Sequence, residues 1–373
     1  MANHIPLVRS CAALLLVLTG TCCMGADPAA QEAAKSTAAL GVDLYRLLAP
    51  QEGNLFLSPY SITEALALVS DGAAGKTQGE ILHALHWSGP QKDMAAAFAA
   101  LERQLDMAAR DGANLSVANG LWYQRGGAPV ESFLEVARDD YRAEVRPVDF
   151  IGSSPSVSQE INDWVSAKTL GKITGLFPPG SISGSARLVL ANAVYFKGRW
   201  ENPFREYDTS PHSFFLTADR SIQVPTMESS AKLQAATMDD CSLLALPYAG
   251  GDLSMVIVLP KARGGLSDLE QQLSPDKLGT WLQAVDSAGP WEVHVRLPKF
   301  KVSYAAELTG PLRQLGMTSA FTPGQADFSG IDGGRDLLLS ALMHKAYVEV
   351  NEEGTVAAAA TGGSFSVAAV ETP

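Results

Sequence analysis

The stretch HKAYVEVNEEGTVAAAATGG, residues 344–363, decides how the rest of the chain is interpreted. Polar and β-branched residues alternate from Tyr347 to Asn351 with a period of two, which predicts a strand. An acidic turn around Gly354 follows, and every second residue from Thr355 to Gly363 is then small. In a strand these small residues would share one face. Such a strand would enter an existing sheet without displacing core side chains, with Gly354 as its hinge.

The same alanines have a second interpretation. Ala357 to Ala360 form the best short helix former in the chain, and an alanine-rich tail is more often a frayed helix or a linker. No proline lies between Pro323 and Pro373, so no hydrogen-bond donor is missing if the segment joins a sheet. The rest of the chain favours the strand.

Length and charge limit the possible classes of protein. A chain of 373 residues is long enough for one large core or two domains. Its net charge of −12 argues against a nucleic acid or an anionic membrane as partner. Helical and strand patterns mix throughout, which predicts one α+β unit over residues 27–373.

Residues 1–26 have the order of a secretory signal peptide, with Arg9, then a short apolar run, then small residues. The apolar run is too short to span a membrane, so we expect export to a secreted or periplasmic location and no transmembrane segment. A lipid anchor at Cys22 is an alternative, because residues 18–22 resemble a lipoprotein cleavage site. Beyond the leader only Cys241 remains, which excludes an internal disulfide, and Asp239 and Asp240 disfavour its thiolate.

Sequence patterns predict the main elements. Helices are expected over 31–48, 58–69, 78–85, 157–169, 266–273 and 305–315, and strands over 115–123, 188–196, 253–259, 292–297 and 337–350. Ser58 and Thr77 are expected to cap the helices that follow them, with Glu80 completing a capping box. The strand 188–196 is almost wholly apolar and should be central, so Asn192 within it needs buried partners.

The usual catalytic signatures are missing from the sequence. Residues 180–184 have the glycines of a nucleophile elbow but carry Ile182 where serine is required. We interpret His83 and His86 as a surface pair and His212 and His294 as isolated structural residues.

His344 is different, because it sits in an apolar strand and needs a buried partner. Ser58, Ser61 and Asn192 are candidates for one polar cluster with it beneath a sheet. A hydrolase that uses His344 with a serine is the enzymatic alternative.

Several motifs in this order resemble one family, the serpins. They are 54–62 NLFLSPYSI, 71–78 DGAAGKTQ, 162–165 NDWV, 169–173 TLGKI, 188–200 LVLANAVYFKGRW, 246–248 LPY, 253–255 LSM, 326–330 ADFSG and 352–355 EEGT. The resemblance implies a serpin fold, in which a helical N-terminal part packs on a large mixed central sheet, with a second antiparallel sheet and an exposed reactive loop. It implies a serine protease inhibitor that is consumed rather than an enzyme. We expect no cofactor, and the sequence does not identify a heparin-like one.

The family mechanism assigns roles to particular positions. A protease attacks the loop, here residues 352–373, and forms an acyl-enzyme; the loop then inserts into the central sheet and the covalent complex survives. By position, Ser58, Ser61, Asn192 and His344 resemble the family's shutter residues. Trp200 resembles the tryptophan where the loop enters, called the breach, and Lys299 is expected to pair with Glu352. The hinge residues are Glu352, Glu353, Gly354, Thr355, Ala357, Ala358, Ala359 and Ala360.

Hinge spacing places the bond that the protease cuts between Ala368 and Ala369, with Phe365 and Val370 as fallback positions. A small residue there suits an elastase- or subtilisin-like target. No arginine or lysine follows Lys345, which argues against a trypsin-like target. A cysteine protease is an alternative target.

The resemblance departs from the family pattern at the end of the chain. Family members continue past the cut bond with two further strands, whereas the sequence given ends at Pro373. We therefore expect C-terminal strands to be absent, apolar sheet surface to be exposed and this chain alone not to inhibit. A non-inhibitory serpin-like binding protein or an inactive truncated fragment is the corresponding alternative.

Overall fold

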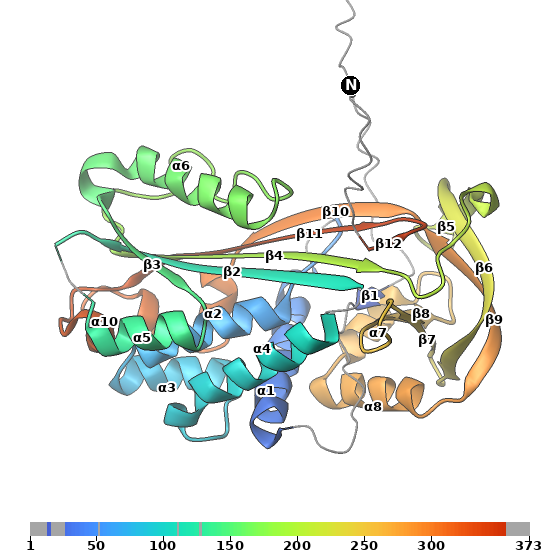
Figure 1. Ribbon diagram of the computed structural model, residues 1–373, viewed down its shortest axis with the longest axis horizontal. Coiled ribbons are helices and arrows are strands. Elements are labelled where there is room, and N and C mark those ends of the chain that lie inside the picture. The colour runs from blue at the N-terminus through green and yellow to red at the C-terminus, as the bar shows by residue number, and fades with distance from the viewer. Residues whose placement is uncertain (1–12, 16–26, 51–52, 110–111, 127–128, 356–373) are drawn as a thin grey trace, which may run out of the picture.

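The computed structural model describes residues 13–15, 27–50, 53–109, 112–126 and 129–355. A long twisted sheet crosses the molecule, with helices α1 to α5 packed on one face and α6 lying across the other (Figure 1). A second group of strands, β5 to β9, closes one end together with α7 and α8. This arrangement confirms the predicted α+β fold with two sheets.

The helices and strands have the following bounds. The α-helices are α1 Pro28–Leu48, α2 Pro59–Asp71, α3 Gly75–Ala84, α4 Met94–Ala109, α5 Glu131–Asp139, α6 Phe150–Lys168, α7 Leu266–Gln272, α8 Pro275–Asp286, α9 Thr309–Gln314 and α10 Ser329–Asp332, with short 3-10 helices η1 Gln91–Asp93, η2 Glu206–Asp208 and η3 Ser319–Phe321. The strands are β1 Ala13–Leu15, β2 Ala113–Gln124, β3 Glu144–Val148, β4 Leu188–Arg199, β5 Ser210–Phe215, β6 Ser221–Thr237, β7 Cys241–Pro247, β8 Ser254–Pro260, β9 Pro290–Pro298, β10 Phe300–Glu307, β11 Leu339–Val350 and β12 Gly354–Thr355.

The central sheet has the order β10-β11-β12-β4-β2-β3. Strand β4 is buried on both faces, as the apolar sequence predicts: Leu190 packs into the core that α2 shares, while Val189 and Ala191 pack beneath α6. Over most of their length β4 and β11 pair directly and in parallel. Near one end the short strand β12 lies between them and is antiparallel to both.

The second sheet has the order β1-β8-β7-β6-β5, with β9 paired to β6. Its outermost strand β1 comes from the leader, where Ala13–Leu15 pairs antiparallel with β8. This pairing departs from our expectation that the leader lies outside the fold, because the exposed edge of β8 offers unpaired backbone groups.

Two expected features near the helices are wrong. The helix expected over 305–315 begins only at Thr309, because Ala305 and Ala306 belong to β10 and pair with Lys345 and His344 of β11. The alternation of exposed and less exposed residues in β10 is a strand period that the alanines concealed.

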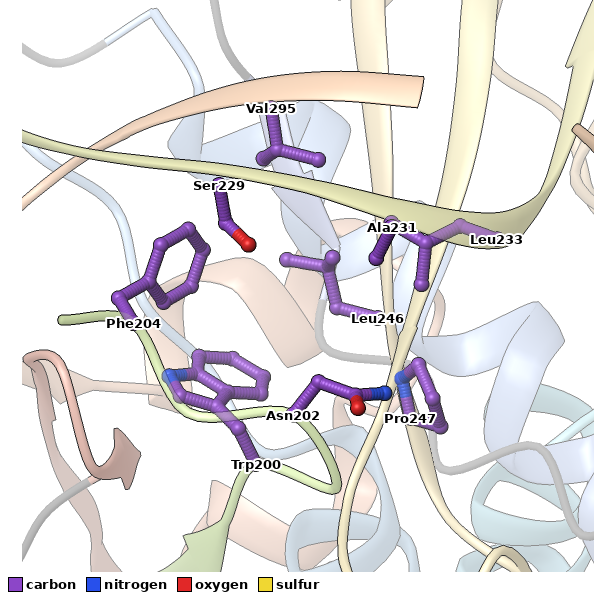
Figure 2. A pocket seen from close by; sticks show the side chains of 9 residues that line it. All are labelled: Trp200, Asn202, Phe204, Ser229, Ala231, Leu233, Leu246, Pro247 and Val295. Atoms are coloured by element: carbon purple, nitrogen blue, oxygen red, sulfur yellow. The ribbon is translucent and has the colours of Figure 1, made fainter. Parts of the chain in front are cut away.

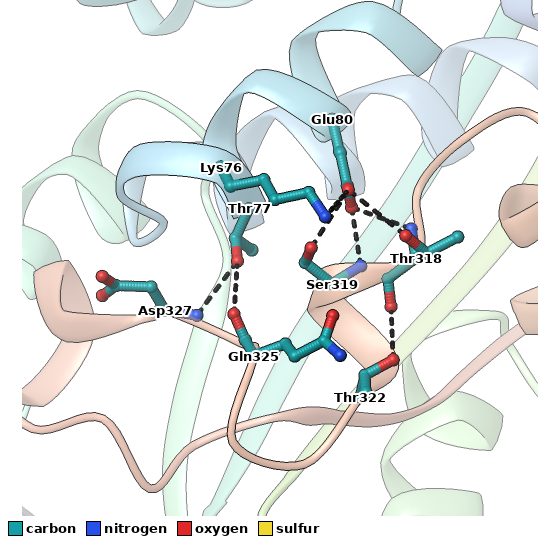
Figure 3. Close-up of polar contacts among 8 residues, drawn as sticks. All are labelled: Lys76, Thr77, Glu80, Thr318, Ser319, Thr322, Gln325 and Asp327. Atoms are coloured by element: carbon teal, nitrogen blue, oxygen red, sulfur yellow. Dashed lines mark hydrogen bonds and ion pairs between the residues drawn. The ribbon is translucent and has the colours of Figure 1, made fainter.

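Thr77 does not cap α3. The helix begins at Gly75 behind Ala74, with no side-chain cap. The Thr77 hydroxyl instead accepts the Asp327 N–H at 3.0 Å, and the Glu80 carboxylate accepts the N–H groups of Thr318 and Ser319 at 2.9 and 2.6 Å (Figure 3). These residues tie α3 to the segment that leads toward β11.

The four surface histidines have different environments. His83 is exposed, and His86 lies 2.6 Å from the Asp43 carboxylate. We expected His212 and His294 to be isolated, but both contact the carboxylate of Glu228. The registers of β5, β6 and β9 bring these residues together, and sequence distance hides it. Among the residues that the structure describes, no group of three or more histidine, cysteine or acidic side chains is arranged to hold a metal ion.

Candidate functional site

The buried polar cluster predicted around His344 is present beneath the central sheet. His344 of β11 and Asn192 of β4 are directly opposite each other in the parallel ladder, and both are fully buried. His344 Nε2 accepts the Ser58 N–H at 3.2 Å, so Nδ1 carries the proton and donates to Asn192 Oδ1 at 2.7 Å. Burial lowers the pKa of His344 to about 3, which keeps the ring neutral.

Helix α2 joins this cluster through its first turn. The Ser61 hydroxyl donates to Asn192 Oδ1 at 2.7 Å, and the Asn192 amide donates back to the Ser61 carbonyl at 3.0 Å. Ser58 caps the helix and Pro59 occupies its first position, as the sequence predicts. All four shutter candidates therefore meet in one hydrogen-bonded group that holds β4 and β11 together over α2.

The hinge begins as a strand between β4 and β11. Gly354 pairs with Arg199 and Thr355 with Gly198, while Thr355 also pairs with Val350. The Thr355 hydroxyl lies 2.6 Å from the hydroxyl of Tyr248.

Position 354 requires glycine for steric reasons. A Cβ there would lie 2.0 Å from the Gly198 carbonyl oxygen. Sequence reasoning assigned Gly354 the freedom of a hinge, whereas the structure shows that close packing between backbones excludes any side chain.

Trp200 lies under the entry point of this strand. Its ring is buried and stacks on Tyr248, with centroids 4.8 Å apart and planes 8° apart. Its Nε1–H donates to the Asn351 carbonyl at 3.0 Å, and its backbone N–H donates to the Glu353 carbonyl at 2.9 Å. Tyr248 and Asn351 were not predicted as site residues, although LPY at 246–248 was among the recognised motifs.

An ion pair holds the acidic turn at the start of the predicted hinge. Lys299 Nζ lies 2.8 and 2.7 Å from the two carboxylate oxygens of Glu352, and the Thr209 hydroxyl donates to the same group at 2.8 Å. Burial raises the pKa of Glu352, but the hydrogen bonds from Lys299 and Thr209 together with a backbone hydrogen bond lower it by more, so the net pKa is below its ordinary value. The carboxylate therefore stays ionised and paired.

A small pocket lies behind this region. Trp200, Phe204 and Leu246 form its apolar wall, and the side chains of Ser229 and Asn202 are its polar groups (Figure 2).

Some predicted site residues lie outside the described part of the chain. These are Ala357, Ala358, Ala359, Ala360, Ala368, Ala369 and Cys22. Cys241 is buried, and burial together with Asp240 raises the pKa of its thiol to about 11, so the thiol is not an activated nucleophile.

The comparison with protein families decides the identity of the fold. The family model described as "Serpin (serine protease inhibitor)" matches residues 35–373. The chain belongs to the serpin family. Leukocyte elastase inhibitor A of Mus musculus is 39% identical to this serpin over 319 residues, which is 83% of each chain. A serine protease inhibitor of Cyanea capillata is 36% identical over 337 residues, 90% of this chain and 89% of the relative.

Solved serpin structures superpose closely on this one. Emu ovalbumin matches with a TM-score of 0.80 and 29% identity over 90% of this chain and 92% of the neighbour. Serpin48 of the insect Tenebrio molitor matches with a TM-score of 0.80 and 30% identity over 90% of both chains. Within the described residues of this serpin, no helix is both long and apolar enough to cross a membrane.

Proposed function

We propose that this serpin inhibits a serine protease of the elastase or subtilisin type by trapping the acyl-enzyme. The observation that carries the proposal is β12, because Gly354 and Thr355 already form the first two residues of a strand between β4 and β11. A loop that continues in this direction would lengthen that strand and part the direct β4–β11 ladder.

The reaction with the protease needs no catalytic group from the serpin. The protease serine oxygen attacks the carbonyl carbon of Ala368, and the bond to the nitrogen of Ala369 breaks. That nitrogen leaves as an amine with a proton from the protease, and residue 368 remains as an ester on the serine. Insertion of the loop then competes with hydrolysis of the ester.

The target class rests on the residues of the loop and on the names of relatives. Alanine at the cut bond suits a shallow primary pocket, and the mouse relative is named as an inhibitor of leukocyte elastase. The leader composition at residues 1–26 supports export, so the protease would be one that this serpin meets outside the cytoplasm.

Mass spectrometry of the protein from its native source, before and after mixing with an elastase-type protease, tests the proposal. We expect an adduct that resists denaturation and a released peptide that starts at or near Ala369. Cleavage without an adduct would refute inhibition and favour the non-inhibitory alternative, whereas an adduct with a papain-like protease alone would change the target class.

A hinge variant provides the control for insertion. Thr355→Arg places a long charged side chain where Thr355 is buried beside Tyr248, so cleavage should continue while the adduct disappears. Arg335→Ala is the control variant, because Arg335 is 79% exposed and precedes Leu339, the end of β11 opposite to Val350 where β12 pairs, and it should form the adduct normally.

A further inference from the structure

The polar cluster under the sheet continues beyond the four predicted residues. Asn119 of β2 is directly opposite Asn192 of β4, and Asn192 Nδ2 donates to Asn119 Oδ1 at 2.7 Å. Asn119 Nδ2 then donates to Glu64 Oε2 of α2 at 2.6 Å. The donors point in one direction, from the Ser58 N–H through His344, Asn192 and Asn119, and the chain of hydrogen bonds ends on the Glu64 carboxyl group.

Glu64 is an unusual end for such a chain because it is 2% exposed. The Tyr60 hydroxyl donates to its other oxygen at 2.8 Å. Charged groups from the surrounding elements also act on it, since Glu102 of α4 raises its pKa and Arg142 before β3 lowers it. Glu64 and Asp106 of α4 in turn raise the pKa of Tyr60, and Glu64 raises that of Tyr141. Burial is the largest effect and raises the pKa of Glu64 to about 8.

Each amide in the chain is fixed by its neighbour. Asn119 presents its carbonyl to Asn192 because its NH₂ group is committed to Glu64. Asn192 consequently presents its carbonyl oxygen to His344 and Ser61. Reversing one amide would place donor against donor along the row, which costs about 1–3 kcal/mol for each buried group left unpaired.

Insertion of a strand would break the series of hydrogen bonds from His344 to Glu64 at one place. Neighbouring strands lie about 4.8 Å apart, so a new strand between β4 and β11 separates their facing residues by about twice that distance. The 2.7 Å contact between His344 and Asn192 must then break, while Asn192, Asn119 and Glu64 stay connected. The free energy of the closed sheet therefore depends on how firmly Asn119 and Glu64 hold the Asn192 side chain in its orientation.

We propose that Glu64 is a positioning residue for loop insertion, which orients Asn192 through Asn119 so that opening of the sheet depends on whether Glu64 carries a proton. The proposal rests on the inhibitory function proposed above and deepens it. An ionised Glu64 accepts the Asn119 N–H more strongly, but the cost of burying its charge is the larger effect, so the closed sheet is favoured while Glu64 is neutral. Loss of the proton leaves a charge buried beneath β2 and β4, which favours any state that admits water to α2.

A synthetic peptide that copies residues 355–366 reports opening without a protease. Its rate of incorporation into the intact protein is followed by native electrophoresis from pH 6.5 to 9.5. In the wild-type protein we expect incorporation to be about tenfold faster at pH 9 than at pH 7, because the ionised fraction of a carboxyl group with a pKa of about 8 rises about tenfold over this range. In Glu64→Gln, which holds the same shape without a titrating proton, the rate should not change with pH.

Two further variants separate positioning from plain stability. Asp71→Asn removes the other carboxyl group of α2 with a raised pKa. Asp71 is half-buried and contacts Tyr141 and Gln91 rather than Asn119 or Asn192, so the pH profile of peptide incorporation should survive. Asn119→Ser keeps Glu64 but cuts its link to Asn192. This variant should keep the pH dependence of urea unfolding and lose that of peptide incorporation, and it serves even if Glu64→Gln does not fold.

A flat pH profile in the wild-type protein would overturn the proposal, as would a profile unchanged by Glu64→Gln or by Asn119→Ser. The inhibitory function is judged separately by the protease adduct. If the yield and rate of the adduct do not change with pH or in Glu64→Gln, the role of Glu64 is refuted and the inhibitory function stands. Peptide incorporation with the expected profile but no protease adduct would sink the inhibitory function alone.

Discussion

One methyl group at position 354 should disable the strand that begins there. In Gly354→Ala the new Cβ would lie 2.0 Å from the Gly198 carbonyl oxygen, so β12 must leave its place between β4 and β11. We expect the fraction of cleavage events that end as a covalent adduct to fall severalfold, measured by denaturing electrophoresis with an elastase-type protease. Gly79→Ala is the control, because a Cβ on Gly79 meets nothing within 4 Å; equal losses in both variants would contradict the steric explanation.

Lys299 and Glu352 form the ion pair at the start of the predicted hinge. Lys299→Met leaves the buried Glu352 carboxylate with only the Thr209 hydroxyl as a side-chain donor. Because Lys299 is partly exposed to solvent, we expect a modest loss of about 1 kcal/mol in the free energy of unfolding.

The sign of the pH dependence follows from the lowered pKa of Glu352. The pair stabilises the wild-type protein above the ordinary carboxyl pKa, and this contribution is lost as pH falls through the lowered value. The difference between wild type and Lys299→Met should therefore shrink at acid pH in urea titrations. Lys301→Met, which removes the more exposed pair with Glu349, should change stability by only a few tenths of a kcal/mol.

Some residues of the polar cluster could be predicted from the sequence and others could not. Asn192 and His344 were predictable because each is a polar residue inside an apolar strand. Glu64 has the same signal, lying in the apolar run ITEALAL, yet only the register of β2 against β4 shows which amide it holds. That register is set by pairing between strands more than 60 residues apart, which local patterns do not contain.

At the scale of elements, α3 is joined to the 318–327 segment by side chains rather than by packing alone (Figure 3). Glu80 accepts the backbone N–H and hydroxyl groups of both Thr318 and Ser319. Glu80→Ala leaves these donors unpaired, and we expect a loss of about 1–3 kcal/mol in urea unfolding. Lys76→Ala removes the exposed partner of Glu80 and should cost less than about 0.5 kcal/mol. Similar costs would mean that the ion pair, and not the hydrogen bonds to Thr318 and Ser319, stabilises this junction.

The sequence predicted element type better than element ends. The serine-proline start of α2 and the apolar strand β4 were found because their signals are local. The start of α3 was missed because Thr77 and Glu80 suited a capping box, whereas both side chains reach a segment about 240 residues later. Capping patterns identify residues that can satisfy free backbone groups, but not whose groups they satisfy.

For the whole molecule, two carboxyl groups on α2, the buried Glu64 and the half-buried Asp71, should make stability fall as pH rises. Burial raises the pKa of Glu64 from 4.5 to about 8 and that of Asp71 from 3.8 to about 6. Each contribution is complete below the unfolded pKa and is lost as pH rises through the folded pKa. For Glu64 the free energy of unfolding should fall between pH 4.5 and 8 by up to about 1.4 kcal/mol per pH unit.

Urea titrations across this range measure the fall. Asp71→Asn should make the fall shallower between pH 3.8 and 6, and Glu64→Gln should make it shallower between pH 4.5 and 8. A wild-type stability that rises steadily to pH 8 would show that both groups are ionised in the folded protein. In strong acid the lowered pKa values of Glu80 and Glu352 act in the opposite direction, so stability should be greatest in mildly acidic solution.

The direction of β12 has a consequence for the balance of forces in the sheet. Strands β4 and β11 share one parallel ladder, while β12 is antiparallel to both. Each residue by which β12 lengthens therefore exchanges a slanted parallel contact for two antiparallel ones, which are slightly more stable per residue. Backbone pairing therefore favours each added residue, while the buried hydrogen bond between His344 and Asn192 opposes the step that separates these two residues. Hydrogen exchange measured during insertion should show amide exchange slowing first at the ends of β4 and β11 near Trp200 and later farther along both strands.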